Sequence, residues 1–190
     1  TYSVKDITGS INPGDSVVDG GDSVSVSGSA TLQPDGTDVS GSADLFLDGS
    51  STGSTTVSSG SYSSTVTAPE AIGSHSVTAE FLNSNGINGT ASTSLEVRNL
   101  TFQNYRGSDS VLNPGEQYTF KVDITEFDSS TRYDVTSGSF DVDYRGSTYS
   151  LSHVSGSTWE TRVSSNSNLE NGKSVSFNVS GTSTVNDISG

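Results

Sequence analysis

Apolar and polar residues alternate along most of this chain of 190 residues. In the segment SVSVSGSATL (23–32), Val24 and Val26 fall on one face of an extended strand and the intervening serines on the other. The same period of two residues recurs in segments 74–82, 117–125, 139–147, 158–163 and 173–180. This period is typical of half-buried strands in an antiparallel sheet, and no segment has a sustained helical period. The pattern therefore predicts an all-β protein.

The second half of the chain repeats the first. Seven segments recur in one order: YSVKDI and LTFQNY open the two halves, and GTASTSLEV and GTSTVNDIS close them. Clusters of Gly, Asn, Asp and Ser separate the strands every ~8–12 residues, as in sandwiches and barrels. We predict two tandem antiparallel β-sandwiches of about seven strands each, which occupy residues 1–98 and 99–190.

One recurring phrase predicts a turn. INPGDS (11–16) in the first half matches LNPGEQ (112–117) in the second. Proline favours the second position of a type II turn, and the third position needs a positive φ, which glycine adopts readily. We expect Pro13-Gly14 and Pro114-Gly115 to form this turn, which carries the chain from the first strand toward the second, and we expect no binding role.

The junction between the halves predicts a stiff connection. The segment LEVRNLTFQ (95–103) contains no Gly, Pro or Ser, whereas flexible linkers are rich in Gly and Ser. Seven antiparallel strands also leave the two ends of a sandwich at opposite poles. We therefore expect the last strand of the first sandwich to run almost directly into the second, so that the two stack end to end as a stiff rod.

Composition narrows the range of partners. The apolar share is 29%, well below the roughly 45–50% of ordinary domains, which predicts thin cores and polar outer faces. Asp and Glu number 22 against 8 Lys and Arg, so the formal charge is −14. Such a surface repels nucleic acid and anionic membranes, and we expect neither as a partner. Abundant Ser, Gly and Asp with few Lys resemble the extracellular proteins of salt-loving archaea, and some low-complexity bacterial adhesins share this composition. The first resemblance predicts a halophilic protein.

The chain contains neither Cys nor Met. The lack of Cys excludes disulfides and thiolate metal sites, and the lack of Met indicates a processed product or an excised piece of a longer protein. No apolar run approaches the roughly 20 residues that span a bilayer. We expect no direct membrane insertion by this segment, and any membrane or wall anchor would lie outside it.

Residues 41–81 resemble the bacterial and archaeal Ig-like domains that recur in tandem in large cell-surface, adhesin and S-layer-type proteins. The resemblance rests on the turn Leu47-Asp48-Gly49 and on GSHSVTAEF (73–81), which follows the family pattern Gly-x-His-x-Val-x-Ala-x-aromatic. The second half departs from the pattern, with Lys173 in place of the His and Phe177 in place of the Ala, so its membership rests on the internal repeat. The resemblance implies an Ig-like sandwich in a surface protein and no catalytic residues.

Catalytic patterns are missing from the sequence. The two histidines, His75 and His153, fall at non-equivalent places in the two repeats. Neither a Gly-x-Ser-x-Gly nor a His-Glu-x-x-His motif occurs. His75 is in phase with Val77, which predicts a partly buried strand position. We expect that the protein is not an enzyme and needs no catalytic cofactor.

Aromatic residues are candidates either for the core or for sugar binding. Trp159 lies at the position that Tyr62 holds in the first repeat, which predicts a core residue. Tyr144 shares a face with apolar neighbours and is also expected inside. Tyr105 and Tyr133 are less constrained by the pattern, and they leave open an exposed aromatic platform for a glycan.

Pairs of aspartates offer oxygen ligands of the kind that Ca²⁺ prefers. Asp141 and Asp143 fall on one outer face of a predicted strand, and Asp19 and Asp22 flank a Gly-Gly turn. Neither pair has the spacing of an EF-hand loop. A calcium site at one of these pairs and a solvated acidic face are the two interpretations.

Three Asn-x-Ser/Thr sequons mark candidate N-glycosylation sites, at Asn88, Asn99 and Asn178. Strand phase places Asn99 and Asn178 on the outside, and Asn88 falls in a predicted loop. An acceptor must be exposed, so all three are candidates in a host that secretes and glycosylates the protein.

Together these features predict a non-enzymatic extracellular module: a stiff, acidic spacer or assembly unit of a cell-surface protein of S-layer or adhesin type. The expected partners are other surface-protein domains or copies of the chain itself, which unpaired edge strands could join by strand addition. Two alternatives stay open. One is a glycan- or receptor-binding module, and the other is a surface subunit of a virion or filament.

Overall fold

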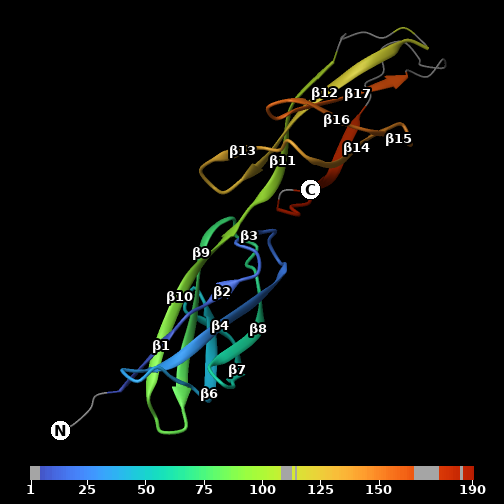
Figure 1. Cartoon of the computed structure of the whole chain (residues 1–190). Coiled ribbons are helices and arrows are strands. Elements are labelled where there is room, and N and C mark those ends of the chain that lie inside the picture. The colour runs from blue at the N-terminus through green and yellow to red at the C-terminus, as the bar shows by residue number, and fades with distance from the viewer. Residues whose placement is uncertain (1–4, 108–112, 114, 165–175, 185) are drawn as a thin grey trace. The chain divides into compact units, whose positions relative to one another are not determined.

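The computed structural model describes residues 5–107, 113, 115–164, 176–184 and 186–190 (Figure 1). The chain divides into two compact units, Thr1–Val97 and Arg98–Gly190, which we call unit 1 and unit 2. No described residue is helical, and the described chain offers no helix long and apolar enough to cross a membrane. The all-β architecture that the alternation predicts is confirmed.

The first sheet of unit 1 is organised around β4. It consists of β1 (Asp6–Gly9), β2 (Asn12–Pro13), β4 (Ser23–Gln33), β5 (Thr37–Asp38) and β8 (Ser61–Thr67). All four other strands pair antiparallel with β4. Val24 and Val26 of β4 are buried and the serines next to them in the sequence are exposed, as the sequence pattern predicts.

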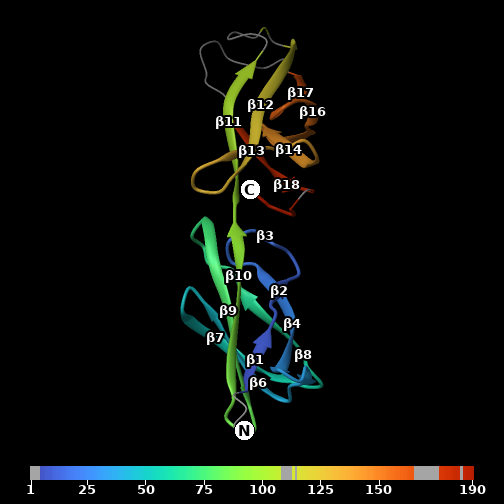
Figure 2. The same ribbon diagram turned by 60° about the vertical axis from the view of Figure 1, so that its left-hand side comes forward.

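The second sheet of unit 1 has the order β3-β10-β9-β6-β7. Its strands are β3 (Val17–Val18), β6 (Gly41–Leu47), β7 (Ser50–Val57), β9 (Gly73–Asn83) and β10 (Asn88–Val97). Only β3 runs parallel to its neighbour within this sheet. In both ribbon views β9 and β10 lie on one side of unit 1 and β4 and β8 on the other, so the sheets form a sandwich (Figures 1 and 2).

The N-terminal strand of unit 1 crosses from one sheet to the other. β1 pairs with β4 in the first sheet, whereas β3 pairs with β10 in the second. The phrase INPGDS covers the crossing. Asn12 and Pro13 still pair with β4, and the Ser16 carbonyl already accepts the amide of Glu96 on β10 (2.9 Å).

The type II turn expected at Pro13-Gly14 is wrong. Gly14 does not have a positive φ, and its amide donates to the Ser25 carbonyl at 2.8 Å. A Cβ at Gly14 would lie too close only to Ser25 Oγ, the end of an exposed side chain that can rotate, so backbone pairing with β4 takes the place of the turn. Gly115 does have a positive φ of 84°, while Pro114 lies outside the described residues.

The first sheet of unit 2 corresponds to that of unit 1. It contains β11 (Asn99–Gly107), β12 (Gln117–Phe127), β13 (Arg132–Asp134), β16 (Ser152–Ser155) and β17 (Thr158–Ser164). The order is β11-β12-β17-β16, and β13 also pairs with β12. β12 is the counterpart of β4, and both strands have 11 residues.

The second sheet of unit 2 has the order β15-β14-β18. Its strands are β14 (Gly138–Tyr144), β15 (Ser147–Ser150) and β18 (Phe177–Ser183), all antiparallel. The residues that alternation places inside are buried on both central strands: Phe120, Val122 and Ile124 on β12, and Phe140, Val142 and Tyr144 on β14. Unit 1 keeps β7 as one strand, whereas unit 2 divides the same stretch into β15 and β16, which belong to different sheets.

The last pair of segments matched in the internal repeat is not equivalent in the structure, so this part of the predicted repeat is wrong. GTASTSLEV (89–97) lies in β10, but GTSTVNDIS (181–189) covers the end of β18 and the turn after it. Asn83 and Ser183 are equivalent, because each faces the first residue of the central strand beside it.

The counterpart of β10 therefore begins only near Ile188, whose carbonyl accepts the Ser183 amide at 2.8 Å. By the same register Phe177 corresponds to Val77 and not to Ala79, since Val77 faces Leu47 and Phe177 faces Tyr144. Lys173, the expected counterpart of His75, lies outside the described residues.

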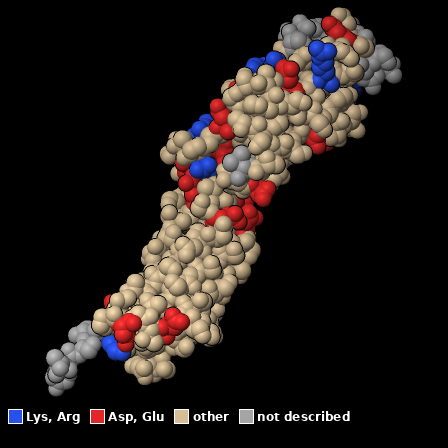
Figure 3. Space-filling view, viewed as in Figure 1, with Lys and Arg blue, Asp and Glu red and all other residues tan. Residues whose placement is uncertain are grey.

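Charge is divided unequally between the units. Unit 1 contains 11 Asp and Glu against a single Lys, Lys5, for a formal charge of −10, whereas unit 2 contains 11 against 7 Lys and Arg, for −4. In the space-filling view, basic side chains accordingly gather over unit 2 (Figure 3). The number of acidic residues is equal, so unit 1 carries −10 of the formal charge of −14 because it has almost no basic residues.

Candidate functional site

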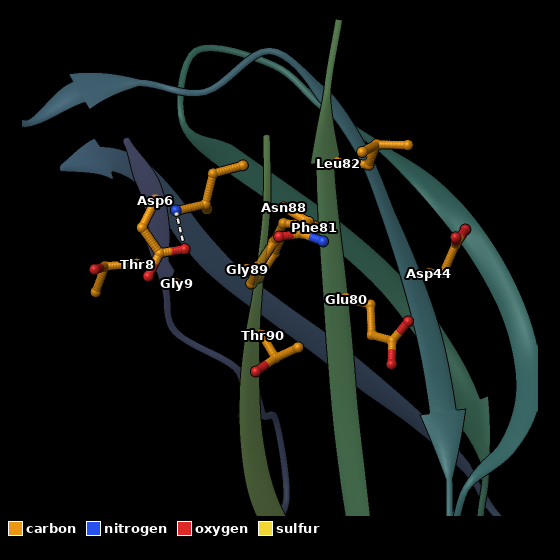
Figure 4. A pocket seen from close by; sticks show the side chains of 11 residues that line it. Asp6, Thr8, Gly9, Asp44, Glu80, Phe81, Leu82, Asn88, Gly89 and Thr90 are labelled. Atoms are coloured by element: carbon orange, nitrogen blue, oxygen red, sulfur yellow. Dashed lines mark hydrogen bonds between the residues drawn. The ribbon is translucent and has the colours of Figure 1, made fainter. Parts of the chain in front are cut away.

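A polar groove opens on unit 1 where β1 meets β9 and β10 (Figure 4). Its volume is about 670 Å³. The lining residues are Asp6, Ile7, Thr8, Gly9, Asp44, Glu80, Phe81, Leu82, Asn88, Gly89 and Thr90. β1 and β10 approach closely here because residue 89 is glycine, and a Cβ at that position would collide with the Ile7 carbonyl.

The lining of this groove is acidic. Three carboxylates line it, from Asp6, Asp44 and Glu80, and no basic side chain does. Asp44 and Glu80 are exposed and lie directly opposite each other on β6 and β9, a placement that normally destabilises a sheet. Neither carboxylate has a hydrogen bond or ion pair within the described chain, so the groove has a negative potential that disfavours anionic ligands.

The groove lacks an aromatic surface for a sugar. Phe81 is the one aromatic residue in its lining, and this side chain is 1% exposed. The ring packs instead against Tyr62, with centroids 5.4 Å apart in an edge arrangement. Stacking on a glycan would need an exposed ring face, so this groove offers only polar contacts.

A second polar site in unit 1 centres on His75, near the start of β9. Its Nδ1 lies 2.7 Å from Asp48 Oδ2, and its Nε2 lies 2.7 Å from the Ala71 carbonyl oxygen. The Ser76 amide donates to the other oxygen of Asp48 at 2.8 Å. The His75 side chain is 12% exposed, which confirms the partly buried strand position that the sequence predicts.

Electrostatics couple the two titratable groups of this site. Burial lowers the pKa of His75, but its hydrogen bonds to Asp48 and the Ala71 carbonyl raise it, and the net pKa lies above the ordinary value. The hydrogen bond from His75 and the one from the Ser76 amide lower the pKa of Asp48. Asp48 and His75 both belong to the motifs on which the Ig-like resemblance rests. Those motifs were the one feature of the sequence that could have pointed to this contact.

Unit 2 contains a buried ion pair that the sequence pattern does not predict. Glu126 is 3% exposed, and Arg98 Nη1 donates to its Oε2 at 3.2 Å. The Ser183 hydroxyl and the Asn186 side-chain amide each donate to the same carboxylate at 2.7 Å. The Arg98 guanidinium also lies 3.8 Å from the centroid of the Tyr133 ring, so Arg98 is fixed to unit 2.

A second, more exposed ion pair lies on the outer face of unit 2. Arg106 donates from both terminal nitrogens to Asp123, at 2.6 and 2.9 Å. Thr158 and Asn104 add hydrogen bonds of 2.8 and 2.9 Å to the same carboxylate. These donors, Arg106 foremost, hold the pKa of Asp123 well below its usual range.

The two aspartate pairs considered for calcium occupy surface positions. Asp141 accepts a hydrogen bond from Ser150 Oγ at 2.7 Å and Asp143 one from Thr148 Oγ1 at 3.0 Å, both across β14 and β15. Asp19 and Asp22 are joined by a backbone hydrogen bond across their turn. No group of three or more His, Asp or Glu that could hold a metal ion occurs among the described residues, so a calcium site at either pair stays a prediction.

The aromatic residues divide into buried and exposed ones as the sequence predicts. Trp159 is buried and donates its indole N–H to the Val135 carbonyl at 2.8 Å. Tyr62, at the matching place in unit 1, donates its hydroxyl to the Ser10 carbonyl at 2.8 Å. Tyr105 and Tyr133 are exposed, but the Tyr133 hydroxyl donates to Asp128, so this side chain is held in place.

The three sequons are accessible. Asn88 and Asn99 are the first residues of β10 and β11, Asn178 is the second residue of β18, and all three side chains are exposed. Their use as N-glycan acceptors stays a prediction. Asn88 also lines the groove of unit 1, so a glycan there would cover part of it.

In unit 1, two sheets face each other and the N-terminal strand crosses from one sheet to the other, which defines an Ig-like β-sandwich. A structure described as that of a 1.5-MDa bacterial ice-binding adhesin, in work on its retention at a host cell surface, is similar over 98% of this chain. The identity is 21% and the TM-score 0.50, and the chain spans 62% of that structure. This similarity supports the Ig-like fold.

Two further solved structures match with lower TM-scores. The fibronectin(III)-like modules of CbhA from Clostridium thermocellum match over 94% of this chain and 88% of their own, at 15% identity and a TM-score of 0.37. The adhesin InvE of Yersinia pseudotuberculosis matches over 96% of this chain and 58% of its own, at 16% identity and a TM-score of 0.36. No protein-family model and no curated protein matches the sequence.

Proposed function

We propose that the chain is a non-catalytic spacer or assembly unit of an extracellular, cell-surface protein. In this role the tandem Ig-like sandwiches keep other parts of the protein at a distance from each other. One observation carries this proposal. β10 ends at Val97 and β11 begins at Asn99, so a single residue, Arg98, separates the last strand of unit 1 from the first strand of unit 2.

The environment of Arg98 supports a stiff connection. Its guanidinium is held by Glu126 and lies over the Tyr133 ring. A link of one residue with a bound side chain leaves few free torsions, whereas a Gly- and Ser-rich linker leaves many. Such a link favours a role that depends on length and stiffness.

The polar sites support a role without catalysis. Both ring nitrogens of His75 are engaged with Asp48 and Ala71, so this histidine has no nitrogen left to act as a general base. Similarity to an adhesin supports the location at a cell surface. The partners we propose are other domains of surface proteins or further copies of this chain.

A glycan- or receptor-binding role is less well supported. The groove of unit 1 supplies carboxylates and the Asn88 amide, which can bond hydroxyl groups. Its aromatic residue is buried, however, and the exposed ring of Tyr105 belongs to unit 2. No described site combines a ring face with convergent polar groups, so we place the spacer role first.

Small-angle X-ray scattering tests the proposal. The matched control inserts a flexible segment of Gly and Ser between Val97 and Arg98 and leaves both sandwiches unchanged. We expect the natural chain to fit one extended conformer, and the insertion variant to need a broad range of interdomain angles. Equal breadth for the two proteins, or a compact profile for the natural chain, would contradict the spacer role.

A further inference from the structure

We propose that His75 is a pH-operated latch of unit 1: as an imidazolium it ties the turn between β6 and β7 to the loop between β8 and β9, and on deprotonation it loses one of these contacts. The inference concerns unit 1 alone. It stands whether or not the chain serves as a spacer.

The geometry of the ring requires two donors. A neutral imidazole has one N–H donor and one acceptor nitrogen, whereas an imidazolium donates from both nitrogens. Both partners of His75 are acceptors: a carboxylate oxygen of Asp48 and the carbonyl oxygen of Ala71, each at 2.7 Å. A neutral ring would direct a lone pair at one of these oxygens, so the observed contacts suit the protonated form.

The latch joins segments that are distant in sequence. Asp48 lies in the turn after β6 with a positive φ of 49°, and the Ser76 amide holds its second oxygen. Ala71 lies in the loop that leads into β9. His75 itself faces Leu95 of β10, a fully buried residue.

Few other charges act on the ring. Asp48 is the titratable group in contact with it among the described residues. Glu70 shares the loop with Ala71, but its carboxylate lies toward Gly21. Glu96 follows Leu95 and therefore points to the opposite face of β10. The one basic side chain of unit 1, Lys5, pairs with Asp35.

The direction of the titration follows from the folded and unfolded states. An unfolded histidine has a pKa of about 6.5, and that of His75 is raised in the folded protein. The latch therefore stabilises unit 1 fully below about pH 6.5, and this stabilisation is lost as the pH rises through the folded pKa. The pKa of Asp48 is lowered, so its contribution is lost only below about pH 3.9.

Unit 2 provides an internal contrast. The turn after β14 has Arg145 at the position that Asp48 holds after β6, with a similar positive φ of 52°. An arginine cannot accept a hydrogen bond from a histidine. Unit 2 therefore lacks the latch, and its unfolding should not follow the pH dependence of unit 1.

Nuclear magnetic resonance of the isotope-labelled chain tests the inference directly. We expect the pKa of His75 to exceed 6.5, both ring nitrogens to carry protons at pH 6, and the Asp48→Asn variant to lower this pKa. Thermal unfolding supplies the second readout. Unit 1 should melt at a lower temperature at pH 8.5 than at pH 6 in the natural chain and in the control His153→Gln, and this difference should shrink in His75→Gln.

The natural chain alone can overturn the latch. A His75 pKa at or below 6.5, or a single protonated ring nitrogen at pH 6, contradicts it without any variant. Equal pH dependence of unit 1 in His75→Gln and in the natural chain contradicts it as well.

Discussion

Unit 1 and unit 2 share a strand plan but fill it with different side chains. Of the 15 aromatic residues, 4 belong to unit 1 and 11 to unit 2. Strand register equates Ala43 with Phe140, and Leu47 with Tyr144. The same sheets therefore form around small aliphatic residues in one unit and around stacked rings in the other. The comparison shows that the period of apolar positions selects the fold, while side-chain volume is free to vary.

The two units also differ in their polar interactions. Unit 2 has 7 of the 8 basic residues and uses Arg98 and Arg106 in ion pairs with Glu126 and Asp123. Unit 1 has a single Lys, Lys5, which pairs with Asp35, and a histidine in contact with Asp48. Each unit therefore has its own weak points, and substitutions that exchange equivalent residues can expose them.

The largest effect should come from Phe140→Ala, which gives unit 2 the residue of unit 1. Phe140 is 1% exposed and packs edge-on against Trp159, with centroids 4.8 Å apart. We expect unit 2 to lose about 3–5 kcal/mol in free energy of unfolding, because the cavity cannot collapse fully. Urea unfolding followed by the fluorescence of Trp159, the single Trp of the chain, reports on unit 2 alone.

The matched control for Phe140→Ala is Ala43→Phe in unit 1. Ala43 is fully buried, so overpacking should cost unit 1 about 1–3 kcal/mol and leave the Trp159 transition in place. A loss below 1 kcal/mol for Phe140→Ala would show that unit 2 can repack like unit 1 and would remove the contrast between the two cores.

A somewhat smaller effect is expected from Glu126→Leu, which introduces the residue that unit 1 has at Leu32. The change takes the carboxylate away from Arg98, whose side chain is 12% exposed, and from two hydrogen-bond donors. We expect a loss of about 3 kcal/mol in the free energy of unfolding of unit 2, because the arginine loses its buried counter-charge.

The double variant Glu126→Leu with Arg98→Leu is the control for this ion pair. Replacing both charges by apolar residues should recover part of the loss, as a double-mutant cycle would measure. If Glu126→Leu alone leaves the urea midpoint unchanged, the buried pair is not a stabilising difference between the units.

The smallest effect, and one of opposite sign, is expected from Tyr144→Phe. The Tyr144 hydroxyl is buried and has no hydrogen-bond partner among the described residues, whereas unit 1 has Leu47 at this place. Removing an unsatisfied hydroxyl should stabilise unit 2 by about 1 kcal/mol, since the ring keeps its stack on Phe177 at 5.1 Å. A loss of stability on urea unfolding would mean that the hydroxyl is bonded to an ordered water.

Local pattern predicts the faces of the strands but not their polar partners. Period-two spacing correctly places Val77, Phe120 and Trp159 inside. It fails at the end of β12, where Thr125 is buried although it is out of phase with Ile124, and where the inward position 126 holds a carboxylate. Residues from elsewhere in the chain cover this part of β12. Arg98, for example, bonds Glu126 from a position 28 residues earlier in the sequence. The local pattern around β12 cannot predict such a contact.

The repeat shows a second limit of sequence reasoning. In a chain rich in Ser and Thr, short segments such as GTAST and GTSTV can match without being structurally equivalent. Here the match aligned the end of β18 with β10, although the two strands are not counterparts. Gly14 shows a third limit. The letters Pro-Gly suggest a turn, but the Gly14 amide donates to the Ser25 carbonyl of β4 instead. In both cases a long-range contact decides between local alternatives.

The crossing of the N-terminal strand has a mechanical consequence. β3 and β10 are parallel neighbours, paired through Val17 with Glu96 and Val18 with Val97, and they lie near the N-terminal and C-terminal ends of the sequence of unit 1. Tension applied at those ends would pull the two strands along their length in opposite directions. Their hydrogen bonds would then resist in shear and fail together, whereas those of a hairpin opened from its end are unzipped one by one.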